Sequence, residues 1–159
     1  MANLIYMTVK GKKQGLISQG CGTFDSIGNS YQIGHENEIL IYSFQHLMNR
    51  EQNVQHHPVL LIKPVDKSSP LLAQSLCDNE ELECLFNFYR TNANGGLELY
   101  YTIRLGCAKL SSIKCDYPHS QDHNNMNPQE VVTISYKDIT WNHKTCSTGA
   151  YSFWEERIY

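Results

Sequence analysis

Apolar side chains recur at every second position along much of the chain, which is the spacing of a β-strand with one buried face. In the segment 81–90, apolar residues from Leu82 to Phe88 alternate with polar or charged ones. After the turn sequence at 92–96, which contains two asparagines and two glycines, the same alternation continues through 97–105. The two segments therefore predict a β-hairpin.

Further strands are expected from similar patterns, at 4–9, 38–44, 59–63, 108–117 and 131–141. The last of these changes phase near Lys137 and Asp138, because the next large apolar residues are Ile139 and Trp141. A β-bulge within one continuous strand is the simplest interpretation of that change. The fold class that follows is mainly β.

One short helix is predicted between the strands at 59–63 and 81–90. Ser69 is in place to be its N-cap and Pro70 to occupy the first helical position. An apolar stripe follows, formed by Leu72, Ala73, Leu76 and Cys77. The helix should end near Asp78.

The segment 11–35 carries six glycines and no clear periodicity. It predicts a long loop or an irregular extension. Loops of this length are uncommon in compact domains unless they have a function, which is often to bind another surface.

The composition is that of one compact domain spanning 1–159, with 41% hydrophobic and 18% charged residues. The net charge is −3, and no run of one sign is present, so nonspecific nucleic-acid binding is disfavoured. Apolar runs are far shorter than the roughly 20 residues that span a bilayer, so no stable membrane insertion is expected. The first thirteen residues place apolar residues before lysines, the reverse of a secretory signal.

The six cysteines are too sparse for a small disulfide scaffold, and reduced thiols are the default. Cys84, on the apolar face of its strand, and Cys77, at the end of the helical stripe, are expected to be buried. Cys21 and Cys146 lie in glycine- and serine-flanked segments and are expected to be the reactive thiols.

A metal site is conceivable from a set of ligand-type residues: Cys107, Cys115, His119, His123, His143 and Cys146. No pair of cysteines has the close spacing of a zinc knuckle, so loop histidines and half-buried thiols are the favoured interpretation. A small hydrolase that uses a cysteine and a histidine stays an alternative, since such partners meet only in space. We predict no catalytic residue, no metal and no cofactor.

Several strings, in order, resemble the Hcp family, the tube protein of bacterial type VI secretion. They are NLIYMTVKGKKQGLISQGCG, DSIGNSYQIGHENEILIYSFQH, REQNVQHHPVLLIKPVDKSSPLLAQSL, ELECLFNFYRTN, YPHS and the closing YSFWEERIY. The similarity looks closest to the enterobacterial branch. It implies two packed β-sheets in a barrel-like domain, with one short side helix and a long protruding loop.

The resemblance also implies a function and partners. Six copies would form a ring, and rings would stack into a tube inside a contractile sheath, tipped by the spike protein VgrG and able to carry effector proteins in its lumen. Such proteins wait in the bacterial cytoplasm and are secreted without a signal peptide. Some relatives carry a toxin domain after the tube domain, but this sequence ends at Tyr159, so no fused toxin is expected.

By the same resemblance, the region 15–46 is expected to contact the next ring in a stack. Apolar residues near its end would be hard for an isolated domain to cover. The residues assigned to this ring-stacking loop are Tyr31, Ile33, His35, Ile39 and Ile41.

Overall fold

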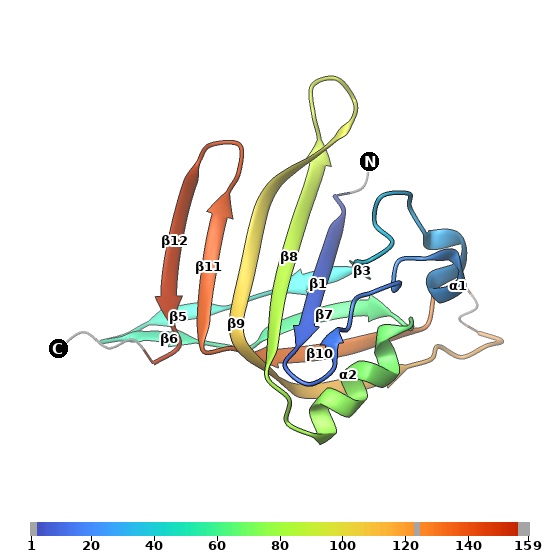
Figure 1. The fold of residues 1–159 in the computed structure, drawn as a ribbon, viewed down its shortest axis with the longest axis horizontal. Helices are drawn as coiled ribbons and strands as arrows, with labels where there is room; N and C mark the ends of the chain where they lie inside the picture. Colours follow the sequence, from blue (N-terminus) through green and yellow to red (C-terminus); the bar gives the residue numbers. More distant parts are fainter. Residues whose placement is uncertain (1–2, 123–124, 156–159) are drawn as a thin grey trace.

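The computed structural model describes residues 3–122 and 125–155, so the last four residues of the closing string lie outside it. Within these ranges the chain is mainly β, as predicted (Figure 1). The first strands and helices are β1 (Ile5–Gly11), β2 (Gly15–Leu16), α1 (Phe24–Ile27), the 3₁₀ helix η1 (Gly28–Ser30), β3 (Ile39–Ile41), β4 (Ser43–Gln45), β5 (Met48–Arg50) and β6 (Val54–His56). The remaining elements are β7 (Val59–Pro64), α2 (Ser68–Cys77), β8 (Leu82–Thr91), β9 (Leu97–Asp116), β10 (Gln129–Ser135), β11 (Asp138–His143) and β12 (Thr148–Phe153).

Two β-layers share the long strand β9. Along its first half β9 pairs with β8 and β11, and along its second half it pairs with β10. Strands β1 and β12 extend the first layer, whereas β7 and β4 extend the second. In Figure 1 the strands of the two layers cross at a large angle. The predicted pair of packed sheets is confirmed, although the barrel is not closed by a continuous strand, because β3 and β4 are separated at Tyr42.

β9 bends where it passes from one layer to the other. A Cβ atom at Gly106 would lie 2.4 Å from Asp138 Oδ1, so any larger residue would displace the Asp138 side chain. The next residue, Cys107, has a φ of 48°, which few non-glycine residues adopt. The two predicted strands 97–105 and 108–117 are therefore one bent strand.

The prediction of one bulged strand over 131–141 is wrong. β10 and β11 belong to different layers, and the chain turns between them at Tyr136 and Lys137. The backbone N–H of Lys137 donates to Gly106 O at 3.1 Å. The change of phase in the sequence thus marks a passage between layers.

The core lies between the layers and consists of the inward-facing residues of nearly every long strand. Its completely buried members include Met7, Val9, Phe86, Leu105 and Ile139. The alternation predicted for β8 is confirmed, since Leu82, Cys84 and Phe86 are all buried. On β9 it holds only in part, because Leu97 is exposed and Thr102 is buried.

Helix α2 begins one residue before the predicted N-cap. The carboxylate of Asp66 accepts the backbone N–H of Ser68 at 2.9 Å. An acidic side chain therefore provides a hydrogen-bond partner for one of the free N–H groups in the first turn of the helix. Leu72 is buried against the core, but Cys77 is exposed. The prediction of a buried Cys77 is wrong because the helix presents its Leu72 and Ser75 face inward.

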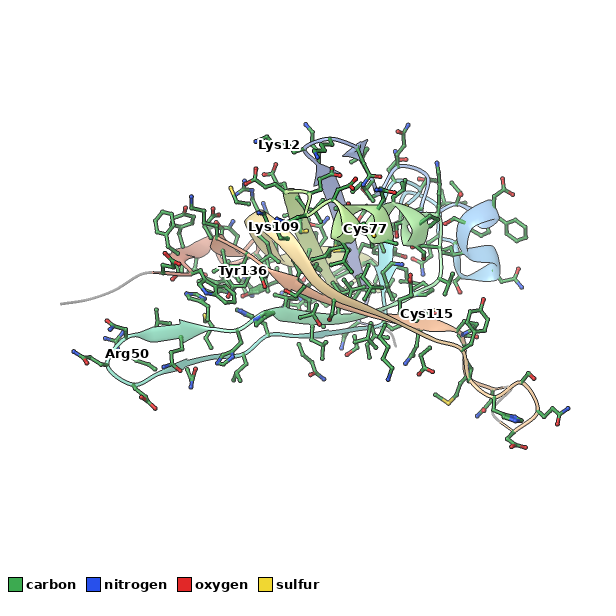
Figure 2. All side chains as sticks on the ribbon, turned by 90° about the horizontal axis from the view of Figure 1, so that it is seen from below. Lys12, Arg50, Cys77, Lys109, Cys115 and Tyr136 are labelled. Atoms are coloured by element: carbon green, nitrogen blue, oxygen red, sulfur yellow. The ribbon has the colours of Figure 1, made fainter. Side chains whose placement is uncertain are left out.

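The irregular segment 11–35 packs more closely than predicted. It contains β2, α1 and η1, and it places Ile17 and Cys21 in the core. A separate feature that projects from the body is the two-stranded hairpin of β5 and β6, with Arg50 at its far end in Figure 2.

A buried ion cluster joins the second layer to α2. Lys63 Nζ lies 2.8 Å from Glu130 Oε1 and 3.1 Å from Asp66 Oδ1, and it also donates to Pro64 O. The side chains of Lys63 and Asp66 are fully buried. Such a charge tolerates burial only while its partners remain.

No helix among the described residues has both the length and the apolar character needed to cross a bilayer.

Replacing the buried cation tests the importance of this cluster. Lys63→Met removes the ammonium group that pairs with the carboxylates of Asp66 and Glu130. Because both carboxylates then stay buried without a cation, the free energy of unfolding should fall by about 3 to 5 kcal/mol. Urea denaturation measures the change, and Lys13→Met at an exposed site is the control, expected within about 0.5 kcal/mol of wild type. A Lys63→Met protein as stable as the control would contradict this role.

Candidate functional site

Apolar side chains are exposed at the α1 end of the molecule. Ile33 is 86% exposed, Phe24 56% and Tyr31 45%, and the rings of Phe24 and Tyr31 meet edge to face at 5.8 Å. We call these three residues the apolar knob. The exposed carboxylates of Asp25 and Glu36 lie beside it in the chain.

The loop that carries the knob is held on the body of the protein by His35. Its imidazole stacks on Tyr6 with 4.1 Å between ring centroids, and its Nδ1 lies 3.1 Å from Glu38 Oε1. Burial, with a smaller contribution from Glu38, raises the pKa of Tyr6 to about 12. His35 thus positions the loop rather than presenting itself to solvent.

Gly22 allows a second close contact to the same loop. Its backbone N–H donates to Glu36 O at 3.0 Å. A Cβ atom at this position would lie 2.0 Å from His35 O, so a larger residue would push the loop away.

Ile39 and Ile41 lie in β3 and face the protein's own core, with exposed fractions of 0% and 4%. The expectation that these two side chains are exposed is wrong. β3 pairs with β1, and that pairing turns both isoleucines inward. Of the five residues assigned to the stacking loop, Ile33 therefore presents most of its side chain outward, and Tyr31 just under half.

The opposite end of the molecule contains a cavity of about 560 Å³ between β9, the β10–β11 turn and the residues that follow β12. Its aromatic walls are Tyr136, Phe153 and Trp154, and its polar lining includes Lys109 and Lys137. Phe153 also packs edge to face on Tyr151 at 4.9 Å, and both side chains are about half exposed. Cys107, Ser135 and Glu155 complete the lining.

Two histidines hold Tyr136 in the wall of this cavity. The phenol oxygen lies 2.7 Å from His46 Nε2 and 2.8 Å from His56 Nδ1. It has one proton to donate, so one imidazole accepts that proton and the other donates its own N–H. His56 Nε2 also lies 3.0 Å from Ser152 Oγ, which links the base of the projecting hairpin to β12.

These groups are desolvated. Burial raises the pKa of Tyr136. Burial also lowers the pKa of His46, and the neighbouring His56 lowers it further. Both effects favour the uncharged network.

The structure corrects one of the two thiols expected to react. Cys21 is buried, donates from Sγ to Ile17 O at 3.2 Å, and has its pKa raised to about 11, chiefly by burial. The expectation that Cys21 is reactive is therefore wrong. Cys146 is exposed and Cys84 is buried, as predicted, and burial raises the pKa of Cys84 to about 12.

The candidate ligand residues do not converge. Within 3–122 and 125–155, no three histidine, cysteine or acidic side chains are placed to hold one metal ion, and His123 lies outside the described residues. His143 Nδ1 accepts the backbone N–H of Cys146 at 3.2 Å, so that hydrogen bond does not involve the thiol. Burial and the carboxylate of Glu81 raise the pKa of Cys107, which opposes thiolate formation.

Comparison with known proteins gives consistent matches. The sequence model of the family described as "Type VI secretion system effector, Hcp" matches residues 6–143. The chain is 38% identical over 171 residues to the "Major exported protein" of Pseudomonas aeruginosa (strain PAO1), with 99% of each chain covered. It is 43% identical over 149 residues to the "Uncharacterized protein YhhZ" of Escherichia coli (strain K12), covering 93% of this chain but only 37% of YhhZ.

Solved structures agree with the sequence matches. The secreted protein Hcp3 from Pseudomonas aeruginosa superposes with a TM-score of 0.88 at 37% identity, covering 98% of this chain and 100% of Hcp3. The crystal structure of an Hcp protein gives a TM-score of 0.91 at 30% identity, covering 98% of this chain and 99% of the other.

The histidine–tyrosine network predicts that stability depends on pH. In the folded protein the pKa of His46 lies below its ordinary value of 6.5, so the unfolded chain binds more protons in this range. The free energy of unfolding should therefore fall as the pH drops from 7.5 to 5.5. Urea titrations at both pH values measure it, and His46→Gln should show a smaller difference than His119→Gln. Equal differences in the two variants would contradict this origin.

Thiol accessibility predicts two classes of cysteine. Cys77, Cys107, Cys115 and Cys146 should react with a maleimide in the native protein, whereas Cys21 and Cys84 should react only after denaturation. Mass spectrometry of timed digests measures each rate. Native labelling of Cys84 as fast as that of Cys146 would refute the assigned burial.

Proposed function

This chain belongs to the Hcp family of type VI secretion proteins, and we propose that it is a structural tube subunit. Six copies form a ring, and rings stack into a tube. The region 1–159 acts as one tube domain, and its role is assembly and transport rather than catalysis.

The observation that carries this proposal is the pair of different surfaces at opposite ends of the fold. The apolar knob lies beside α1, and the aromatic cavity lies beside the end of β12. Figure 1 shows α1 and β12 on opposite sides of the fold. A monomer rarely leaves such apolar groups uncovered. Contacts between two unlike surfaces repeat from copy to copy, and they close into rings or continue as stacks.

Export and partners follow from the same proposal. A relative that matches along its whole length is named "Major exported protein", and we extend export to this chain. The tube waits in the bacterial cytoplasm, surrounded by the contractile sheath and tipped by VgrG. Firing then releases it to the extracellular space or a target cell, with effector proteins in its lumen.

The loop that carries Tyr31 and Ile33 is the ring-stacking contact in this proposal. His35 holds that loop in place through Tyr6 and Glu38. Ile39 and Ile41 support it from the core.

A charge in the knob should prevent rings from stacking into tubes without preventing the rings themselves from forming. Ile33→Asp places an unpaired carboxylate where the proposal requires burial, which is unfavourable by several kcal/mol. Hexameric rings should persist by light scattering, while electron microscopy should find at least about tenfold fewer tubes. Ile33→Val is the matched control and should retain tubes.

The outcome that opposes the assignment is full-length tubes from Ile33→Asp. A wild-type chain that stays monomeric at high concentration would oppose the tube function itself.

A further inference from the structure

We propose that the cavity at the β12 end receives the apolar knob of a second copy of this chain in the adjoining ring. This inference rests on the proposed function and names the receiving surface. The contact joins Ile33 and Tyr31 of one copy to the walls formed by Tyr136, Phe153 and Trp154 of the next.

Unpaired charges on the two surfaces are complementary. Lys109 and Lys137 line the cavity and are exposed, and among the described residues neither has a carboxylate within salt-bridge distance. Asp25 and Glu36 flank the knob, and within the same described ranges neither forms a salt bridge with a lysine or an arginine. Glu155 also lines the cavity, which leaves its charged lining with one net positive charge. Docking would bring carboxylates to the lysines and apolar groups to the aromatic walls.

Both surfaces are already ordered for docking. His35 and Gly22 fix the loop beneath the knob, as described above. Tyr136 is held in the cavity wall by His46 and His56. Association therefore loses little conformational entropy.

The cavity has room for more than one side chain of the knob. Its volume is about 560 Å³, and Ile33 is the most exposed large apolar residue of the described chain. Side chains that fill well-packed, desolvated pockets carry most of the binding energy of an interface, and Tyr31 and Ile33 would do so here.

The positions of the two surfaces determine what repetition of the contact produces. In Figure 1, α1 lies on the right and β12 on the left, toward opposite sides of the fold along its long axis. A contact between unlike surfaces leaves one free surface of each kind at the ends of the assembly. Each added ring would thus present the same cavity to the next.

Charge reversal tests the pairing. Lys137→Glu and Glu36→Lys, each alone, should raise the protein concentration needed for tube formation about tenfold, while rings persist. The double variant restores the opposite charges and should recover most of the loss. Lys13→Glu, at an exposed site in neither surface, is the control and should assemble as wild type.

Cross-linking tests the contact directly and uses a native cysteine of the cavity. Ile33→Cys, oxidised with copper phenanthroline, should form disulfide ladders whose digests link position 33 of one copy to Cys107 of another. Cys107→Ser in the same background should abolish that link.

Normal tubes from both single reversals, no recovery in the double variant, or no link to Cys107 in assembled tubes would each overturn the inference. Failure of the proposed function is distinguishable, because the wild-type protein would then form no hexamer at all.

Discussion

Strand β9 has to leave one layer and enter the other without losing its backbone hydrogen bonds, and its bend determines where most other elements lie. Gly106 permits the close approach of Asp138, and Cys107 adopts a positive φ directly after it. At the same bend, the Gly106 carbonyl oxygen accepts the backbone N–H of Lys137. The bend of β9 at Gly106 and Cys107 therefore determines how the two layers enclose the core, and it also positions the β10–β11 turn and the cavity beside that turn.

The two candidate assembly surfaces are consequences of that arrangement. Pairing of β11 and β12 beyond the bend places aromatic rings around the cavity, and Tyr136 is fixed there by two imidazoles. At the other end, pairing of β3 with β1 turns its isoleucines inward and leaves Ile33 on a loop outside the core. In the proposed assembly, the residues of this segment that stabilise the fold are thus different from those that contact the next copy.

Local alternation in the sequence was sufficient for the hairpin of β8 and β9 and for the β-rich class. It was not sufficient for the path of 131–141, because a change of phase looks the same whether a strand bulges or moves to another layer. Burial of Cys21 was missed since its glycine- and serine-rich flanks resemble a surface loop, although its thiol donates to Ile17 O inside the core. The exposure of Tyr31 and Ile33 followed from the absence of periodicity around them. The cavity was not predictable, because its lining comes from β9, the β10–β11 turn and the chain after β12, which only tertiary structure brings together.

The central claim is that this fold is a subunit whose unlike ends join in a stacked tube. Electron cryomicroscopy of the concentrated wild-type protein tests it most directly. The account predicts six-membered rings stacked in register with Ile33 density inside the cavity beside Lys137. Particles that stay monomeric, or tubes in which the cavity faces only solvent, would contradict it.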